Sequence, residues 1–279
     1  MPAHLNGRSL LCVSACLLAL SIGGIDLRAG QAPDQPAAVG QGRQGQPGQP
    51  GGRGGGRGGR GGMMAAPIPD DTAGFVQIFD GTSLTNWEGD LTFWRVDEGA
   101  IVGESTPANR VAQNSFLIWR GGTVRDFELK LEVRINGTNS GIQYRSKPVP
   151  DAGPFVLQGY QADIDFVNQY TGNIHDERGP RFFLSQRGNV VRGLDGGVKK
   201  LVGTIDQPDA LRGVVNINGW NQYHIIARGS TLLHLLNGRL MAVFLDDDAA
   251  NRLMEGVVGL QMHTGDPFRV EYRNIWLKQ

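Results

Sequence analysis

Cysteine is almost missing from this chain of 279 residues: there are two, Cys12 and Cys16, and both lie close to the start. Beyond them the sequence can form no disulfide and offers no thiolate to act as a nucleophile or metal ligand. A protein without disulfides must be stabilised by packing. This predicts a domain of ordinary size rather than a small disulfide-linked one.

Net charge and several catalytic motifs are also missing. Lys and Arg balance Asp and Glu, 27 to 27, so the composition gives no reason to expect a nucleic acid or an anionic membrane as a partner. There is no His-Glu-x-x-His pair, no Gly-x-Ser-x-Gly elbow and no phosphate-binding loop. Metalloprotease, α/β-hydrolase and kinase functions therefore have no support in the sequence.

The first 32 residues have the pattern of a secretory signal peptide. Basic residues precede an apolar run from Leu10 to Ile22, and Ala29 and Ala32 are small residues suited to cleavage. The run is too short to predict a membrane span. We therefore expect an exported protein, periplasmic or extracellular, with no integral membrane span once residues 1–32 are removed.

Residues 33–73 are rich in Gly, Pro, Gln and Arg, with the stretch Gly51 to Arg60 built from Gly and Arg alone. With so few apolar side chains, such a segment cannot offset the entropy of ordering, and we predict a disordered linker. Arg-Gly-Gly repeats can bind RNA. In an exported protein, a flexible tether is the better explanation.

From residue 74 to residue 279 the pattern predicts one all-β domain. Apolar and charged residues alternate from Asp126 to Asn136, as they do in a half-buried strand, and Asn237-Gly238 predicts a two-residue hairpin turn. Helical periodicity is weak, with short candidates at Asp209–Arg212 and Asp247–Met254. Many short strands without a βαβ rhythm are typical of an antiparallel two-sheet sandwich or jelly roll.

The strand predicted from Gly159 to Asp165 has one apolar and one polar face. Strand side chains alternate, so Gln161, Asp163 and Asp165 point to the same side. A row of two carboxylates and an amide could line the floor of a sugar-binding cleft. A solvated outer face of a sheet would show the same alternation.

Other polar residues recur on apolar strands. They are Gln143 and Arg145, then His175, Asp176, Glu177 and Arg178, and finally Gln261 and His263. If their faces belong to one concave sheet, all of them converge on one cleft with the row at residues 161–165. Taken singly, each has an ordinary explanation as a surface or structural residue. We interpret two further histidines, His224 and His234, as structural or surface residues.

Sandwich-type retaining glycosidases place carboxylates at positions i, i+2 and i+4 of one strand, and retention requires two carboxyls about 5 Å apart. Here the first position is Gln161, which cannot be a carboxylate nucleophile. Asp163 and Asp165 remain, so the pattern is incomplete but still permits a mechanism with two carboxylates.

Seven segments in order carry a family resemblance. They are Gly74–Trp87, Asp126–Arg134, Asn139–Arg145, Gly159–Asp163, Trp220–Tyr223, Leu236–Arg239 and Gly259–His263 continuing through Phe268–Leu277. Together they resemble the 3-keto-disaccharide hydrolase domain family over essentially all of residues 74–279. The resemblance implies a concanavalin A-like jelly roll of the lectin/glucanase type. It also implies an exported bacterial enzyme that acts on glycosides oxidised at C3 of the sugar.

The chemistry implied by this resemblance needs no carboxylate nucleophile. A ketone at C3 acidifies the C2 hydrogen, a base removes that proton, the C1 substituent leaves by elimination, and water then adds. The route requires a base, an acid for the leaving group and a stabiliser for the enolate oxygen. This chain has Gln161 and Asp163 where many relatives have Glu and an amide.

From this resemblance we assign roles as hypotheses. His175 or Glu177 would act as base or acid, Asp163 would orient or bind a hydroxyl, and Arg145 would face the developing oxyanion. The residues expected to bind substrate are Gln143, Gln161, Asp165, Arg178, Gln261 and His263. No cofactor is specified. The side chains of Asp163, His175, Glu177 and His263 could ligate a divalent metal ion, although their spacing matches no metal motif.

Two alternatives remain open at this point, because a fold alone does not define a function. One is a conventional glycoside hydrolase, and the other is a non-catalytic carbohydrate-binding domain on a flexible tether. The aromatic content of 8% is modest, which disfavours a flat aromatic binding platform.

Overall fold

The computed structural model describes residues 72–279 of the chain. The predicted signal peptide and nearly all of the predicted linker lie outside this range, and those predictions stay untested. Among residues 72–279, no helix is long and apolar enough to cross a membrane.

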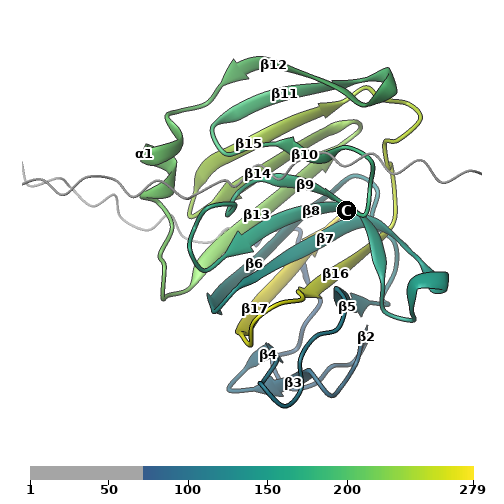
Figure 1. Ribbon diagram of the computed structural model, residues 1–279, viewed down its shortest axis with the longest axis vertical. Helices are drawn as coiled ribbons and strands as arrows, with labels where there is room; N and C mark the ends of the chain where they lie inside the picture. Colours follow the sequence, from purple (N-terminus) through teal and green to yellow (C-terminus); the bar gives the residue numbers. More distant parts are fainter. Residues whose placement is uncertain (1–71) are drawn as a thin grey trace, which may run out of the picture. The chain divides into compact units, whose positions relative to one another are not determined.

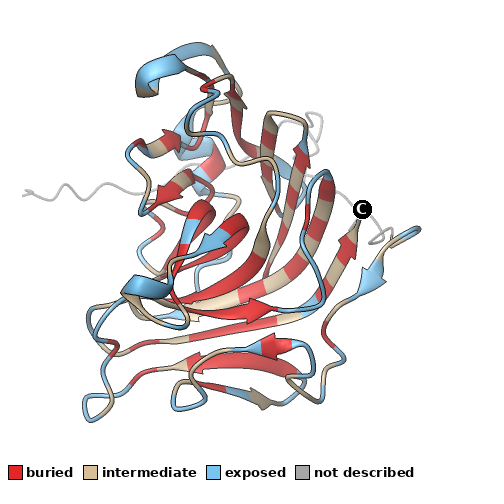
Figure 2. Cartoon of the chain, turned by 90° about the vertical axis from the view of Figure 1, so that its right-hand side faces the viewer, coloured by how far each residue is buried: buried red, intermediate tan, exposed pale blue. Residues whose placement is uncertain are grey.

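Two β-sheets form the described part of the chain (Figures 1 and 2). The ten-stranded sheet has the order β12-β11-β15-β14-β13-β6-β17-β4-β3, with β1 also paired to β17, and the seven-stranded sheet has the order β10-β9-β8-β7-β16-β5-β2. The all-β, two-sheet jelly-roll sandwich predicted from the sequence is confirmed.

The strands of the larger sheet are β1 (Val76–Gln77), β3 (Trp94–Asp97), β4 (Ala100–Glu104), β6 (Phe127–Asn136), β11 (Asn189–Leu194), β12 (Val198–Thr204), β13 (Asn221–Arg228), β14 (Thr231–Leu236), β15 (Arg239–Asp246) and β17 (Arg269–Lys278). Those of the smaller sheet are β2 (Trp87–Glu88), β5 (Ser115–Trp119), β7 (Asn139–Pro148), β8 (Leu157–Asp165), β9 (Ile174–Glu177), β10 (Phe182–Ser185) and β16 (Val257–Met262). The helical turns are η1 (Pro150–Ala152), η2 (Asp195–Gly197) and α1 (Pro208–Arg212).

The hydrophobic core lies between the two sheets. In β6, Phe127, Leu129, Leu131 and Val133 are buried, while the charged residues between them are only half-buried. Figure 2 shows this alternation as bands along the strands. Because each strand contributes every second side chain to the core, its other side chains lie on an outer face.

Strand β8 contributes to the core in the same way. Tyr160, Ala162 and Ile164 are at most 2% exposed and belong to the core cluster, which places Gln161 and Asp163 on the opposite face of the smaller sheet. The predicted split of this strand into an apolar and a polar face is therefore confirmed. The polar face is itself buried, so it is not a solvated sheet surface.

Local turns agree with the sequence in most places. The hairpin between β14 and β15 turns at Asn237 and Gly238, both with positive φ, as a two-residue loop requires. The predicted helix at Asp209–Arg212 is present as α1. The predicted helix at Asp247–Met254 is wrong. Its backbone groups form hydrogen bonds with distant parts of the chain instead of helical ones. The Arg181 side chain donates to the Asn251 carbonyl, and the Leu253 amide donates to the Tyr160 hydroxyl.

One pairing departs from a purely antiparallel sandwich. Strand β11 runs parallel to β15, with Val190 opposite Val243, and antiparallel to β12. This brings the β11–β12 hairpin to one edge of the larger sheet, at the top of Figure 1, close to β10 at the edge of the smaller sheet.

Candidate functional site

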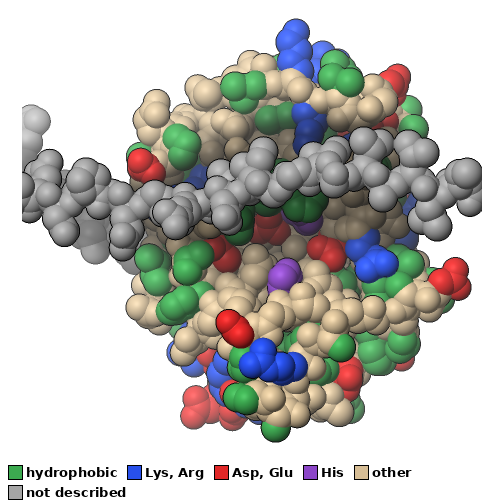
Figure 3. Space-filling view, in the orientation of Figure 1, with side chains coloured by type: hydrophobic (Ala, Val, Ile, Leu, Met, Phe, Trp, Pro, Cys, Tyr) green, Lys and Arg blue, Asp and Glu red, His purple; other side chains and the backbone are tan. Residues whose placement is uncertain are grey.

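A cavity of about 340 Å³ opens on the outer face of the smaller sheet. Figure 3 shows acidic and histidine side chains gathered in a hollow on this side of the molecule. Its lining residues are Asn114, Asn139, Gln161, Asp163, Tyr170, His175, Glu177, Phe182, Phe183 and His263. The structure thus brings together five of the residues singled out from the sequence: Gln161, Asp163, His175, Glu177 and His263.

A chain of side-chain hydrogen bonds runs from Ser146 through Gln143 and Gln161 to Asp163. The Ser146 hydroxyl donates to Gln143 Oε1, and Gln143 Nε2 donates to Gln161 Oε1 at 3.1 Å. Gln161 Nε2 then donates to Asp163 Oδ1 at 2.9 Å. Since Oδ1 accepts this bond, the proton of a neutral Asp163 belongs on Oδ2.

Gly141 provides the space for this chain. Gly141 is paired with Asp163 across β7 and β8, and a Cβ atom on it would lie 2.4 Å from the Gln161 side chain. A larger residue would displace the Gln161 amide. The absence of a side chain at residue 141 is therefore needed to hold the amide against Asp163.

Burial dominates the protonation of Asp163, which is 4% exposed. The loss of hydration raises the pKa of its carboxyl well above the usual range, and the nearby Glu177 and Asp165 carboxylates raise it further. The hydrogen bond from Gln161 acts in the opposite direction but is outweighed. Asp163 is therefore suited to donate a proton.

His175 and Glu177 enter the cavity from β9. In the register of the sheet, His175 lies opposite Gln161 and Glu177 lies opposite Gly159. The His175 Nε2 to Glu177 Oε2 distance is 3.8 Å, and Asn114 donates to Glu177 Oε1 at 3.1 Å. Together with Asp163, they place two carboxyls and an imidazole around one space.

Burial lowers the pKa of His175, and the positive charge of His263 lowers it further when protonated, whereas Glu177 raises it. The imidazole is therefore neutral at physiological pH. Its Nδ1 atom is buried without a hydrogen-bond partner among the described residues. A buried nitrogen in this state can bond to a bound ligand.

Aromatic rings form one wall of the cavity. Tyr170 and Phe183 stack with their centroids 5.4 Å apart, and the ring of Phe182 meets His175 edge-on at 4.9 Å. Such rings can pack against the apolar face of a sugar ring.

Sequence reasoning did not identify these aromatic residues or the amides of Asn114 and Asn139. The adjacent pair Phe182-Phe183, in a short strand just after His175 and Glu177, was the available signal. The positions of Asn114 and Asn139 depend on how loops and strand ends meet, and we find no signal for them in the sequence.

Arg145 does not share the face of Gln143, so that prediction is wrong. A bulge in β7 between Tyr144 and Lys147 interrupts the alternation, and Arg145 has a φ of +48°. Its buried guanidinium instead donates to the carbonyls of Arg125, Gly229 and Leu253 and to Asp126. Ser146 takes the place beside Gln143 that the simple alternation assigns to Arg145.

Asp165 lies outside the cavity as well. Its carboxylate accepts hydrogen bonds at 2.8 Å from the backbone amides of Gln169, Tyr170 and Thr171. These bonds hold the loop that follows β8. Asp165 therefore positions Tyr170 rather than facing a ligand, in contrast to its predicted role in substrate binding.

The other predicted binding residues also lie away from the cavity lining. Arg178 is exposed in the turn after β9, while Gln143 and Gln261 are fully buried. Both amide atoms of Gln261 lack hydrogen-bond partners among the described residues. The two other histidines have structural contacts: His234 bonds to Tyr144 and to the Asn173 carbonyl, and His224 lies 3.0 Å from Glu128.

The predicted ligand-type residues do not form a metal-binding set. Within residues 72–279, no group of three or more His, Cys, Asp or Glu side chains is arranged to hold a metal ion. Asp163, His175, Glu177 and His263 nevertheless surround the same cavity. Their geometry provides polar contacts for a ligand and groups that can exchange protons.

Comparisons with solved structures reveal distant likenesses. A protein from Parabacteroides distasonis ATCC 8503, solved as a candidate glycosyl hydrolase, is 17% identical with a TM-score of 0.48, over 74% of this chain and 94% of that one. The carbohydrate-binding module CBM66 from Bacillus subtilis is 17% identical, with a TM-score of 0.43, over 74% of this chain and 96% of that one. The Bacillus licheniformis β-glucanase is 11% identical, with a TM-score of 0.42, over 75% of this chain and all of that one.

Among curated proteins, a component of the mitochondrial glutamyl-tRNA(Gln) amidotransferase of Podospora anserina is 26% identical over 175 residues. The match covers 60% of this chain but only 27% of that protein, so the chain spans about a quarter of that relative's length.

A family model gives the decisive match, because it covers residues 74–278, which is nearly the whole described domain. The family is the 3-keto-alpha-glucoside-1,2-lyase-like domain. It agrees with the resemblance found in the ordered sequence segments, and this chain belongs to that family.

Proposed function

We propose that this protein cleaves 3-keto-glycosides by elimination. Its family membership supports a carbohydrate-active function. The observation that carries the proposal is the cavity that combines Asp163, whose pKa is raised by burial, with Glu177 and His175 on the neighbouring strand. Elimination requires both an acid and a base, and these groups can supply them.

In the proposed reaction, Glu177 removes the proton from C2 of the sugar, which the C3 ketone has made acidic. The electrons of the C2–H bond form the C1=C2 double bond by way of the enolate, and the C1–O bond breaks. Asp163 Oδ2 gives its proton to the departing oxygen. Water then adds across the double bond, and the net result is hydrolysis.

The remaining groups bind and orient the sugar in this proposal. His175 is a weaker base than an exposed histidine because burial lowers its pKa, so we assign it to hydrogen bonding with the ketone or enolate oxygen. His263, Asn114 and Asn139 surround the same space and can bind hydroxyl groups. Gln161 keeps Asp163 in place.

The experiment compares 3-keto-trehalose with trehalose and follows the release of reducing sugar. We expect cleavage of the oxidised sugar only. Deuterium at C2 should slow the reaction if proton abstraction limits its rate, and should be lost to solvent in the 3-keto-glucose formed. Asp163→Asn and Glu177→Gln should each lower kcat by about 100-fold or more.

Two other functions predict different results. A conventional glycosidase, which the two carboxyls in one cavity also favour, would cleave trehalose and retain deuterium at C2. A carbohydrate-binding domain, which the aromatic wall favours, would bind the sugars and cleave neither. Wild-type turnover by both active-site variants would contradict the assigned roles of Asp163 and Glu177.

We also propose that the protein is exported to the periplasm or the cell exterior, on the basis of the sequence pattern in residues 1–32. Fractionation of the producing cells, with detection of the mature chain by mass spectrometry, tests this. Intact residues 1–32 on a protein in the cytoplasmic fraction would contradict it.

A further inference from the structure

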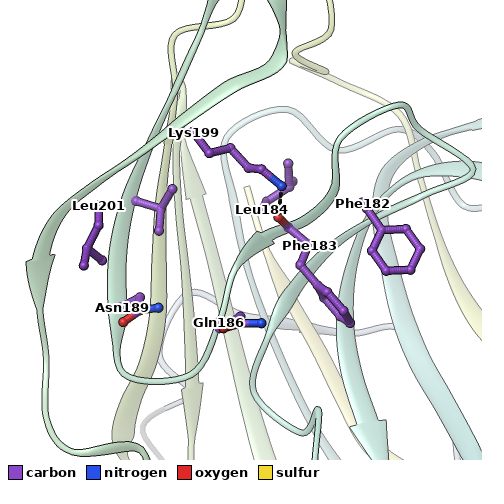
Figure 4. A pocket seen from close by; sticks show the side chains of 8 residues that line it. Phe182, Phe183, Leu184, Gln186, Asn189, Lys199 and Leu201 are labelled. Carbon is purple, nitrogen blue, oxygen red and sulfur yellow. Dashed lines mark hydrogen bonds between the residues drawn. The ribbon is translucent and has the colours of Figure 1, made fainter.

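A second cavity, of about 420 Å³, lies next to the proposed active site. It is an open cavity between β10 and the β11–β12 hairpin at the edge of the larger sheet (Figure 4). The lining residues are Phe182, Phe183, Leu184, Gln186, Asn189, Val191, Lys199 and Leu201. Its size is within the range of small-molecule sites.

The two cavities share Phe182 and Phe183. Phe182 is 62% exposed, and its backbone φ is +56°, which is rare for a bulky residue. A strained conformation of this kind persists only where neighbouring contacts maintain it. Phe182 lines both cavities, so its exposed ring forms a rim between them.

Lys199 supplies those contacts. Its amine donates to the carbonyls of Arg181 at 2.7 Å and Phe183 at 2.6 Å, on either side of Phe182. Figure 4 shows the bond to Phe183. Because the Lys199 amine makes both bonds, it connects the backbone on both sides of Phe182 to β12. The charged amine of Lys199 is therefore bonded to backbone carbonyl oxygens.

The second cavity differs from the first in its chemistry. No Asp, Glu or His lines it, and five of its eight lining side chains are apolar, while Gln186, Asn189 and Lys199 supply polar groups. Leu201 is 56% exposed although it faces a cavity. An exposed apolar surface beside a polar site commonly marks a place where a ligand binds.

We propose that this second cavity binds the leaving group of the glycoside, and that the leaving group is an apolar aromatic ring. The inference rests on the proposed function. The carboxyl and imidazole groups of the proposed reaction line the first cavity and not the second, so the bond that breaks must lie in the first. A substituent on C1 can then extend across Phe182 into the second cavity, where an aryl ring would cover Leu201.

The test uses two substrates with the same oxidised sugar, 4-nitrophenyl 3-keto-glucoside and methyl 3-keto-glucoside. Their kcat/KM ratio is measured for the wild type, for Leu201→Ser and for Leu201→Met. Comparing ratios between variants cancels the intrinsic difference between the two leaving groups. We expect Leu201→Ser to lower the aryl-to-methyl ratio about fivefold, from the loss of apolar contact, and Leu201→Met to retain it.

Val198→Ser is the matched control. Val198 lies on the same strand with the same exposure of 56%, but it does not line the cavity. An unchanged ratio in Leu201→Ser, or an equal change in Val198→Ser, overturns the inference while leaving the proposed function intact. If the wild type cleaves neither substrate, both proposals fail.

Discussion

At the scale of the residue, the protonation of Asp163 connects stability with activity. Burial raises the pKa of Asp163 in the folded state above its value of 3.8 in an exposed setting. The folded protein therefore holds a proton that the unfolded chain releases. The stability that this provides is present at low pH and is lost as pH rises through the raised pKa.

Replacing Asp163 by Asn should remove this dependence, because the amide remains neutral at every pH. We expect the free energy of unfolding of the variant, relative to wild type, to increase as pH rises above 3.8 towards alkaline values. Urea denaturation at a series of pH values measures the difference. A difference that is constant across the series would contradict a protonated Asp163 in the folded protein.

His234 has the opposite dependence. It is fully buried, and the loss of hydration lowers its pKa to about 3 from 6.5. Between these values the unfolded chain binds a proton that the folded protein does not. The stability from neutral His234 is therefore present above pH 6.5 and is lost as pH falls towards 3.

We expect wild type to lose up to about 1.4 kcal/mol per pH unit over this interval from His234 alone. His234→Gln can keep a donor towards the Asn173 carbonyl and an acceptor for Tyr144, but it does not titrate. Denaturant unfolding at pH 4 and pH 7 should show a smaller pH-dependent loss in the variant. Equal losses in the two proteins would mean that His234 is protonated in the folded state.

At the scale of the element, the loop after β8 depends on one side chain. The Asp165 carboxylate accepts three backbone amides as well as the Thr171 hydroxyl. This holds Tyr170 against Phe183 in the aromatic wall.

Asp165→Ala should lower the free energy of unfolding by about 2–3 kcal/mol and raise KM, because hydrogen bonds to a charged group are lost and Tyr170 is released. Asp165→Asn keeps one acceptor oxygen and should lie between Asp165→Ala and wild type. Thermal unfolding and steady-state kinetics on the 3-keto substrate test this. A raised KM without any loss of stability would instead indicate direct contact between Asp165 and substrate.

Strands in which apolar and polar residues alternate regularly could be predicted from the sequence. The positions where this alternation breaks could not. The alternation in β6 and β8 fixed which faces are buried, and this was enough to place Gln161 and Asp163 together. The bulge at Arg145 has no sequence signal, because a single left-handed residue depends on the tertiary bonds that hold it. Phe182 is another case, since its backbone is held by a lysine from a different strand.

At the scale of the whole molecule, Arg145 links the two sheets. Its backbone lies in β7 of the smaller sheet, while Arg125, Asp126 and Gly229 flank strands β6 and β13 of the larger one. The guanidinium is only 1% exposed. A buried donor group that connects layers in this way contributes to stability rather than to chemistry in the cavity, which Arg145 does not line.

Arg145→Lys should therefore lower the free energy of unfolding by about 2–4 kcal/mol, because an ammonium group cannot reproduce four directed contacts. At a temperature where the variant is folded, kcat/KM should remain within about twofold of wild type. Arg178→Lys, at an exposed position, is the control and should change neither quantity. A collapse of kcat in folded Arg145→Lys would restore a role for Arg145 in the reaction.

The position of β17 has a consequence for how the molecule folds. This strand, the last in sequence, lies between β6 and β4 in the larger sheet and also pairs with β1. Strands β6 and β4 cannot become part of one sheet until β17 has paired with both of them. Assembly must therefore wait for contacts between residues far apart in sequence, so we expect slow refolding with a late, cooperative step.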